Sequence, residues 1–154
     1  MKVIETKGIT YLEKFNTSME WYWGTDYTCG DLYEAEEVFR DGKRFEPNRL
    51  IFVHYPEGTV FEPIEAKKNQ YFGSPAYIDG VIYILLVDFH KNLVCIVRCS
   101  DAMDEPSIVT EIPLSEVKDC YNLKIYGSPI MVTRQSGDNH FQIIWPEKVN
   151  FTIG

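Results

Sequence analysis

An internal repeat is the sequence feature that most restricts how this chain can fold. The tripeptide Gly73-Ser74-Pro75 returns as Gly127-Ser128-Pro129, and each copy directly follows an aromatic residue. After the first copy, residues 76–78 and 81–87 are two apolar runs separated by Asp79-Gly80, a dipeptide typical of a tight β-hairpin turn. The first copy therefore predicts a strand, a turn and a second, antiparallel strand.

The second copy continues in a similar way. Residues 130–133 and 140–145 are again apolar runs, and turn-forming residues lie between them at 136–139. A fainter copy precedes both, because Gly30-Asp31-Leu32-Tyr33 is similar to Gly80-Val81-Ile82-Tyr83. The repeat indicates a succession of antiparallel hairpins along most of the chain.

The best-formed unit covers residues 70–117. It predicts four successive antiparallel strands within roughly fifty residues, which is the period of a propeller blade, and a short helical turn at 114–118. Its segment 73–83 resembles the repeats of kelch-type and quinoprotein-type β-propellers. The segment lacks the kelch Gly-Gly pair and the quinoprotein tryptophan motif. The resemblance therefore implies an all-β fold of antiparallel, four-stranded, blade-like sheets and carries no activity with it.

We expect one all-β domain over residues 1–154, with about three repeat units at 16–66, 67–117 and 118–154. Residues 1–15 are expected to complete the last unit. A closed propeller needs at least four blades. Two alternatives therefore stay open: assembly of two copies into six units, and a compact β-sandwich or barrel with one short helix.

Residues 31–40 give two conflicting signals. Leu32, Ala35 and Phe39 have helical spacing, and their neighbours are good helix formers. The correspondence with residues 81–89 instead predicts a strand, and tertiary pairing often overrides local propensity. We therefore predict a strand for this segment.

Composition excludes several classes of partner. The chain has 154 residues, enough for one domain, and its net charge of −8 would repel the phosphate backbone of nucleic acid. We find no apolar stretch of the roughly 18 residues that a membrane helix needs, and no signal peptide at the start. These features predict a cytoplasmic protein that binds neither nucleic acid nor membranes.

The four cysteines, Cys29, Cys95, Cys99 and Cys120, do not have the spacing of zinc ligands. The three histidines are far apart in the sequence as well. We therefore expect free thiols, and neither a metal site nor a cofactor.

The best candidate for a binding site is the aromatic segment 21–27. Trp21, Trp23 and Tyr27 carry large rings, and Asp26 adds a carboxylate, a combination suited to stacking against a sugar or anchoring a partner protein. The alternative is a strand on which Trp21 and Trp23 share one face and fill the core.

Two histidines are further candidates. His90 and His140 each follow an acidic residue in loops that correspond to each other in the repeat, so we expect them at a shared rim of the binding surface.

The function we predict is a non-enzymatic binding or interaction module for a protein partner or a carbohydrate. No nucleophile or phosphate-binding motif occurs in the sequence. One alternative is a small sugar-active hydrolase or lyase with paired carboxylates, for which Asp26 and Glu34 are the first candidates. Another is a structural subunit of a homo-oligomer.

Overall fold

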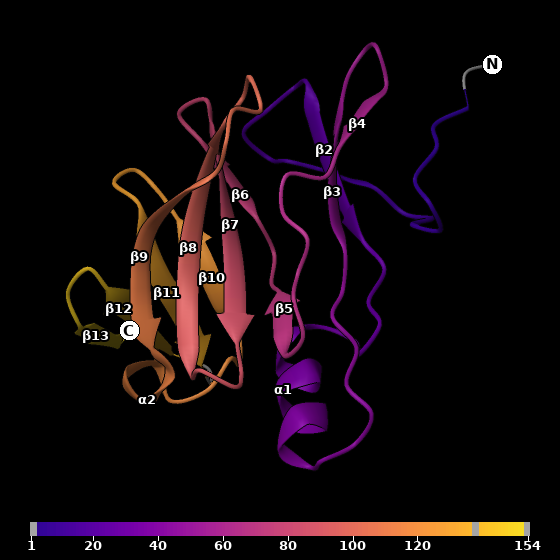
Figure 1. Ribbon diagram of the computed structural model, residues 1–154. Coiled ribbons are helices and arrows are strands. Elements are labelled where there is room, and N and C mark those ends of the chain that lie inside the picture. Colours follow the sequence, from indigo (N-terminus) through magenta and orange to yellow (C-terminus); the bar gives the residue numbers. More distant parts are fainter. Residues whose placement is uncertain (1–2, 137–138, 153–154) are drawn as a thin grey trace.

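The computed structural model describes residues 3–136 and 139–152, which form three antiparallel β-sheets and two short helices (Figure 1). The first sheet contains β1 (Glu13–Lys14), β2 (Trp21–Thr25), β3 (Leu50–His54) and β4 (Thr59–Phe61), in that order. The second sheet contains β5 (Gln70–Phe72), β6 (Ala76–Ile78), β7 (Val81–Asp88), β8 (Leu93–Ser100) and β9 (Ser107–Pro113). The third sheet contains β10 (Leu123–Tyr126), β11 (Met131–Ser136), β12 (His140–Trp145) and β13 (Val149–Thr152), again in sequence order. The expected all-β class is confirmed.

The N-terminal segment has a different place from the one expected. Within the described residues, the third sheet is built from strands between residues 123 and 152. The strand that residues 1–15 contribute is β1, which pairs with β2 and places Glu13 opposite Trp23. Among the described residues of this segment, Glu13 and Lys14 therefore extend the first sheet, and none joins the third sheet.

The Asp79-Gly80 hairpin turn is confirmed. Both residues have positive φ, 51° at Asp79 and 80° at Gly80, as a type I′ turn requires. Gly at the second position adopts this conformation without a steric penalty. The turn joins β6 to β7 and places Ile78 opposite Val81.

The two Gly-Ser-Pro copies do not occupy equivalent positions. Gly73-Ser74-Pro75 separates β5 from β6, and both of these strands pair with β7. Gly127-Ser128-Pro129 instead lies in the turn between β10 and β11, where Tyr126 is opposite Met131. The tripeptide interrupts a strand in the second sheet and connects two strands in the third.

The strand expected over residues 31–40 is wrong, because helix α1 (Leu32–Arg40) lies there. The side chain of Asp31 accepts a hydrogen bond from the backbone N–H of Glu34, and the Glu34 side chain accepts one from the Asp31 N–H. This capping box satisfies two N–H groups at the start of the helix. The apolar side of α1 then packs into the core through Leu32 and Ala35. The expected helical turn near residue 114 is confirmed as α2 (Leu114–Val117).

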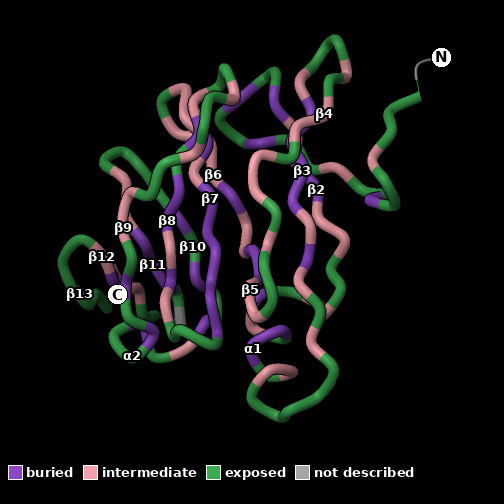
Figure 2. The backbone as a smooth tube through the Cα atoms, in the orientation of Figure 1, coloured by how far each residue is buried: buried purple, intermediate pink, exposed green. Residues whose placement is uncertain are grey.

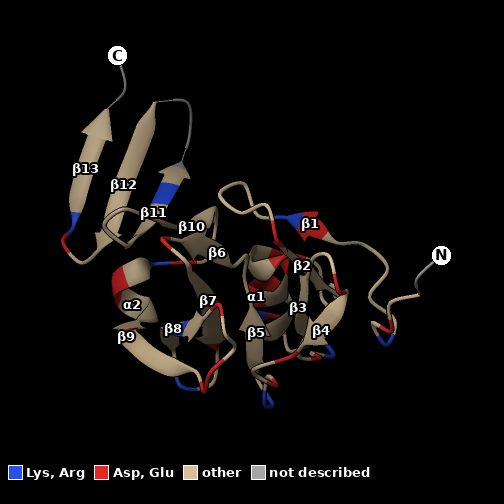
Figure 3. Ribbon diagram, turned by 90° about the horizontal axis from the view of Figure 1, so that it is seen from above, with Lys and Arg blue, Asp and Glu red and all other residues tan. Residues whose placement is uncertain are grey.

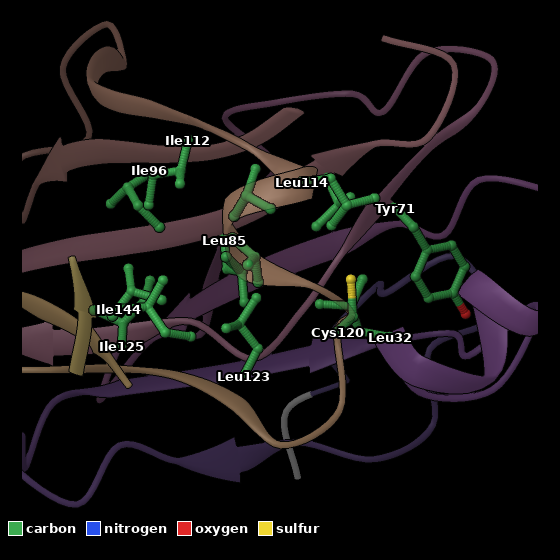
Figure 4. Packing of buried hydrophobic residues seen from close by; sticks show 14 of the residues in the cluster. Leu32, Tyr71, Leu85, Ile96, Ile112, Leu114, Cys120, Leu123, Ile125 and Ile144 are labelled. Atoms are coloured by element: carbon green, nitrogen blue, oxygen red, sulfur yellow. The ribbon is translucent and has the colours of Figure 1, made fainter. Parts of the chain in front are cut away.

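The second sheet is buried on both faces, as the long buried stretch of β7 in Figure 2 shows. One face, with Ile82 and Ile84, packs against the first sheet. The other, with Leu85 and Val87, packs against the third sheet and α1. Figure 4 shows Leu85 and Leu123 facing each other across this second layer of the core. Burial on both sides explains why β7 is almost continuously apolar.

The outer face of the first sheet is covered by the N-terminal segment. Ile9 and Leu12 pack there against Ile51 and Val53 of β3. We call residues 9–12 the N-terminal cover. The order of the layers is therefore the N-terminal cover, the first sheet, the second sheet and the third sheet.

Among the helices that the structure describes, none is long and apolar enough to span a bilayer.

Candidate functional site

A cleft of about 170 Å³ opens where the three sheets and α1 meet. Its walls come from the end of β2, the start of α1, the link between β5 and β6, and the segment that leads into β10. The residues that line the cleft include Trp23, Tyr27, Asp31, Tyr33, Glu34, Ser74, Tyr121, Asn122 and Lys124. The cleft thus collects side chains from four segments that are distant in the sequence.

The start of α1 supplies the carboxylates of the cleft. Oδ1 of Asp31 lies 2.9 Å from the backbone nitrogen of Glu34, and Oε1 of Glu34 lies 3.1 Å from that of Asp31. The helix dipole favours negative charge at this end of the helix. The two carboxylates are therefore fixed hydrogen-bond acceptors on one wall.

The turn before α1 is held by Tyr71 of β5. Its hydroxyl donates to the carbonyl of Gly30 at 2.6 Å and accepts from the backbone N–H of Cys29 at 2.9 Å. Burial raises the pKa of Tyr71 to about 12, so the phenol stays protonated and can donate this bond at neutral pH. The hydrogen bond from Tyr71 therefore fixes the backbone of Gly30, which lines the cleft.

Asn48 joins the first and second sheets at the back of the cleft. The side chain is buried; its Nδ2 donates to the carbonyl of Phe72 at 3.1 Å, and its Oδ1 accepts from the N–H of Phe72 at 2.7 Å. Nδ2 also donates to Oγ1 of Thr25 at 3.2 Å. One side chain therefore holds β5 in place beside the end of β2.

The opposite wall is held by Arg134 of β11. This buried guanidinium donates to the carbonyls of Val117 at 2.9 Å and Tyr121 at 2.7 Å, and also to the carbonyl of Asp119. It forms an ion pair with Oδ1 of Asp119 at 3.2 Å. The end of α2 and the loop that follows it are thus tied through three carbonyls to one cation.

A buried carboxylate holds the same loop from α1. Oε1 of Glu36 accepts from the N–H of Cys120 at 3.1 Å, and Oε2 lies 3.4 Å from Arg40. Among the described residues, Oε2 makes this looser ion pair and no well-directed hydrogen bond. Glu36 therefore couples the loop to the helix that carries the opposite wall.

Aromatic rings form the exposed part of the cleft. Tyr33 and Tyr121 pack edge to face with ring centroids 5.3 Å apart, which joins α1 to the loop. Tyr27 is 48% exposed and has a φ of 51°, an unusual backbone conformation for an aromatic residue. Asn122 on the other side also has a φ of 51°.

Partial burial raises the pKa of the Tyr27 phenol, and the nearby carboxylates of Glu13 and Asp31 raise it further. The phenol of Tyr27 is therefore a neutral hydroxyl that can both donate and accept hydrogen bonds at the edge of the cleft.

Of the candidates from segment 21–27, Trp23 and Tyr27 line the cleft. Trp21 is almost fully buried and lies against His54, with ring centroids 4.6 Å apart. Trp21 and Trp23 belong to the same core cluster, as the alternative interpretation of a core strand requires. Oδ1 of Asp26 accepts from the N–H of Arg49, and Asp26 is not among the described residues that line the cleft.

The two histidine candidates lie elsewhere. His90 is in the turn between β7 and β8, and His140 opens β12. Both are exposed, and neither is among the described lining residues of the cleft.

Sequence reasoning missed the residues that form the far wall. Tyr121, Asn122 and Lys124 belong to a stretch with no recognisable motif, and only the tertiary fold brings them to α1. The spacing of Asp31 and Glu34 is different, because an Asp followed three residues later by a Glu is a local signal for a helix start. That signal could have identified both the helix and the carboxylate wall.

Within the described residues, no group of histidine, cysteine and carboxylate side chains is arranged to hold a metal ion. The four cysteines are free thiols. Comparisons with protein-family models, curated proteins and solved structures found no match to this chain.

Proposed function

We propose that this chain is a non-enzymatic binding module that takes a carbohydrate in the cleft. The observation that carries the proposal is the meeting of exposed tyrosines with carboxylates, an amide and an ammonium in one cleft. A sugar has an apolar C–H face that stacks on aromatic rings and hydroxyls that need hydrogen-bond partners. Both requirements are met by the lining residues.

The size of the cleft supports a small ligand. A volume of about 170 Å³ has room for on the order of ten water molecules, comparable to the heavy atoms of one sugar ring. Drug-sized ligands usually occupy sites of about 300 Å³ or more. We therefore expect one sugar unit, at the end or side of a larger glycan, to enter.

The arrangement of the carboxylates favours binding over hydrolysis. Glycosidases place two carboxyl groups on either side of the scissile bond. Asp31 and Glu34 lie within one helical turn on the same wall, and each is bonded to the backbone of the other. Asp26, the other half of the pair considered above, is bonded to Arg49 outside the cleft.

The arrangement of the three sheets, one for each repeat unit, is consistent with blade-like sheets that share a binding site. The first and third sheets have their strands in sequence order, the second has the order β5-β7-β8-β9 with β6 also paired to β7, and successive sheets pack face to face. In such a stack, loops from successive sheets gather at one place and can form a shared site. We therefore propose that the three sheets are blade-like repeat units whose loops form the cleft.

The test is a saturation-transfer NMR screen of monosaccharides and short glycans, followed by calorimetry on any sugar that binds. Tyr121→Ala and Tyr27→Ala should each weaken binding at least about tenfold, because each removes a stacking surface. Tyr55→Ala is the matched control, since Tyr55 is somewhat more exposed than Tyr27 and Tyr121 but is not among the described residues that line the cleft. Binding that is equally affected by all three substitutions, or by none, would contradict the proposal.

The same samples separate binding from catalysis. The NMR spectrum of a bound oligosaccharide should remain unchanged over hours, because we propose no bond cleavage. Appearance of a new reducing end that is lost in Glu34→Gln would favour the hydrolase instead.

A further inference from the structure

The third sheet has one face that packs on the second sheet and one that points away from it. Nine described side chains lie on the face that points away from the second sheet, and we call this face the outer face. They are Lys124, Tyr126, Met131, Thr133, Gln135, Phe141, Ile143, Val149 and Phe151.

The strand register fixes this assignment. Leu123, Ile125 and Val132 belong to the core between the second and third sheets, so the residues that alternate with them point outward. Thr133 pairs with Ile143, and Ile143 pairs with Val149. A bulge at the end of β12 lets Trp145 return to the inner side opposite Val132.

The two last strands are apolar on the outer side. On β12 and β13, Phe141, Ile143, Val149 and Phe151 point outward. Toward the free end of the hairpin their inward neighbours are polar, namely His140, Gln142, Asn150 and Thr152, whereas Ile144 and Trp145 at the other end of β12 pack into the core. A surface hairpin normally turns its apolar side toward the core of its own molecule. Here the apolar side is turned away from it.

The outer face is exposed or half-buried except at Thr133, which is buried. Tyr126 is 55% exposed and Phe151 is 47% exposed, and Phe141 and Phe151 lie together with ring centroids 6.2 Å apart. Figure 3 shows β12 and β13 projecting from the rest of the molecule, with no Lys, Arg, Asp or Glu within β12. The opposite end of the stack differs, because the N-terminal cover buries Ile51 and Val53 of the first sheet.

We propose that the outer face binds the same face of a second copy of this chain. The two chains would pair about a two-fold axis and continue the face-to-face stacking of sheets from three to six. The proposal does not depend on a ligand in the cleft.

The charge pattern directs a second copy to the outer face rather than to other parts of the surface. The chain carries a net charge of −8, so two copies repel each other over most of their surfaces. The outer face carries no carboxylate, and Lys124 is its one formal charge among the described residues. It is a surface through which two acidic copies can approach without opposing carboxylates. Aromatic enrichment and charge depletion are also what distinguish the centres of protein interfaces.

The size of the face predicts a weak dimer. Four strands about 4.8 Å apart and about five residues long give a footprint of roughly 300 Å². A standard interface buries about 800 Å² on each partner. We therefore expect a dissociation constant in the micromolar range, so that dimers form only as concentration rises.

The test is sedimentation velocity on the full chain from about 1 to about 300 µM, a range that brackets a micromolar constant. The wild type should pass from monomer to dimer. Tyr126→Glu and Phe151→Glu should each raise the dissociation constant at least tenfold, because a charge is buried without a partner. Ile108→Glu on β9 is the matched control, since Ile108 is an exposed apolar residue of another sheet and its substitution should leave the dimer unchanged.

Thermal unfolding of each variant checks that it is folded, and the smaller change Phe151→Ser provides a second test at the same position. A wild type that stays monomeric over the whole range would overturn the proposal. So would a dimer that survives both glutamate substitutions, or one that Ile108→Glu disrupts as strongly.

Discussion

At the scale of single residues, a few buried polar side chains hold the layers in register. Asn48 replaces a missing strand partner for Phe72, and Arg134 gathers three carbonyls from the end of α2 and the loop that follows it. Both side chains act between elements that are not joined by a sheet ladder. The cleft between them depends on both, because each fixes one of its walls.

Asn48→Ala should lower the free energy of unfolding by about 2 to 4 kcal/mol, because two buried backbone groups of Phe72 lose their hydrogen-bond partners. Urea unfolding measures this loss. Asn48→Asp keeps the acceptor for the Phe72 N–H but places a buried carboxylate oxygen against the Phe72 carbonyl, and should cost at least as much as the alanine. The control is Asn150→Ala, since Asn150 is exposed on β13. A loss at Asn48 no greater than the loss at Asn150 would show that this link does not stabilise the fold.

The sequence allowed only part of the site to be predicted at this scale. Trp23 and Tyr27 stood out by residue type, and alternation along a strand correctly placed Trp21 and Trp23 on one face. Composition could not tell which ring also borders a cleft. Tyr121 carries no distinguishing local pattern, because its role arises from the loop that Arg134 holds.

At the scale of elements, the most consequential contact is the N-terminal cover against β2. A Cβ atom at Gly24 would lie 2.7 Å from the carbonyl oxygen of Tyr11 and 2.9 Å from the side chains of Ile9 and Leu12. The cover therefore lies directly on the glycine. Only the absence of a side chain at this position lets the two segments approach so closely.

Gly24→Ala should displace the N-terminal cover and destabilise the fold by about 1 to 3 kcal/mol, since a backbone oxygen cannot move aside as a flexible side chain can. Limited proteolysis should then cleave the segment before β1 faster than in the wild type. Thr59→Ala, at an exposed position on β4, serves as the control. Unchanged proteolysis in Gly24→Ala would mean that the cover is held by other contacts.

Elements whose conformation is set by local residues could be predicted from the sequence. Elements that were assigned by similarity between repeat copies were predicted wrongly. The Asp79-Gly80 turn was correct because its two positive φ values are a property of that dipeptide. Helix α1 was missed because similarity to β7 was given more weight than the helical spacing of Leu32, Ala35 and Phe39, and because the cap formed by Asp31 and Glu34 was not considered. The two Gly-Ser-Pro copies were misleading for the same reason, since identical residues take different places in the second and third sheets.

At the scale of the whole molecule, the three sheets form a stack whose two ends differ. The first sheet ends under the N-terminal cover, and the third ends in the outer face. The all-β class followed from the strand patterns. The order of the layers did not, because an apolar strand gives no indication of which neighbour will cover each of its faces.

Removing residues 1–12 should expose Ile51 and Val53 and create a second open face. The free energy of unfolding should fall by about 2 to 3 kcal/mol from the loss of Ile9 alone, because Ile9 is almost fully buried. The truncated chain should also grow into large assemblies that light scattering detects. Adding Tyr126→Glu to the truncated chain should halt growth at small species, because one face is closed again. A truncated chain that associates no further than the full one would contradict this account of the two ends.

The asymmetry of the stack can be stated in the language of polymer chemistry. A unit with two reactive ends grows without limit, whereas a unit with one reactive end stops at pairs. Because residues 9–12 lie across the first sheet, this chain has a functionality of one, meaning one face that can bind another copy. The close contact at Gly24 holds these residues in place and so keeps the functionality at one.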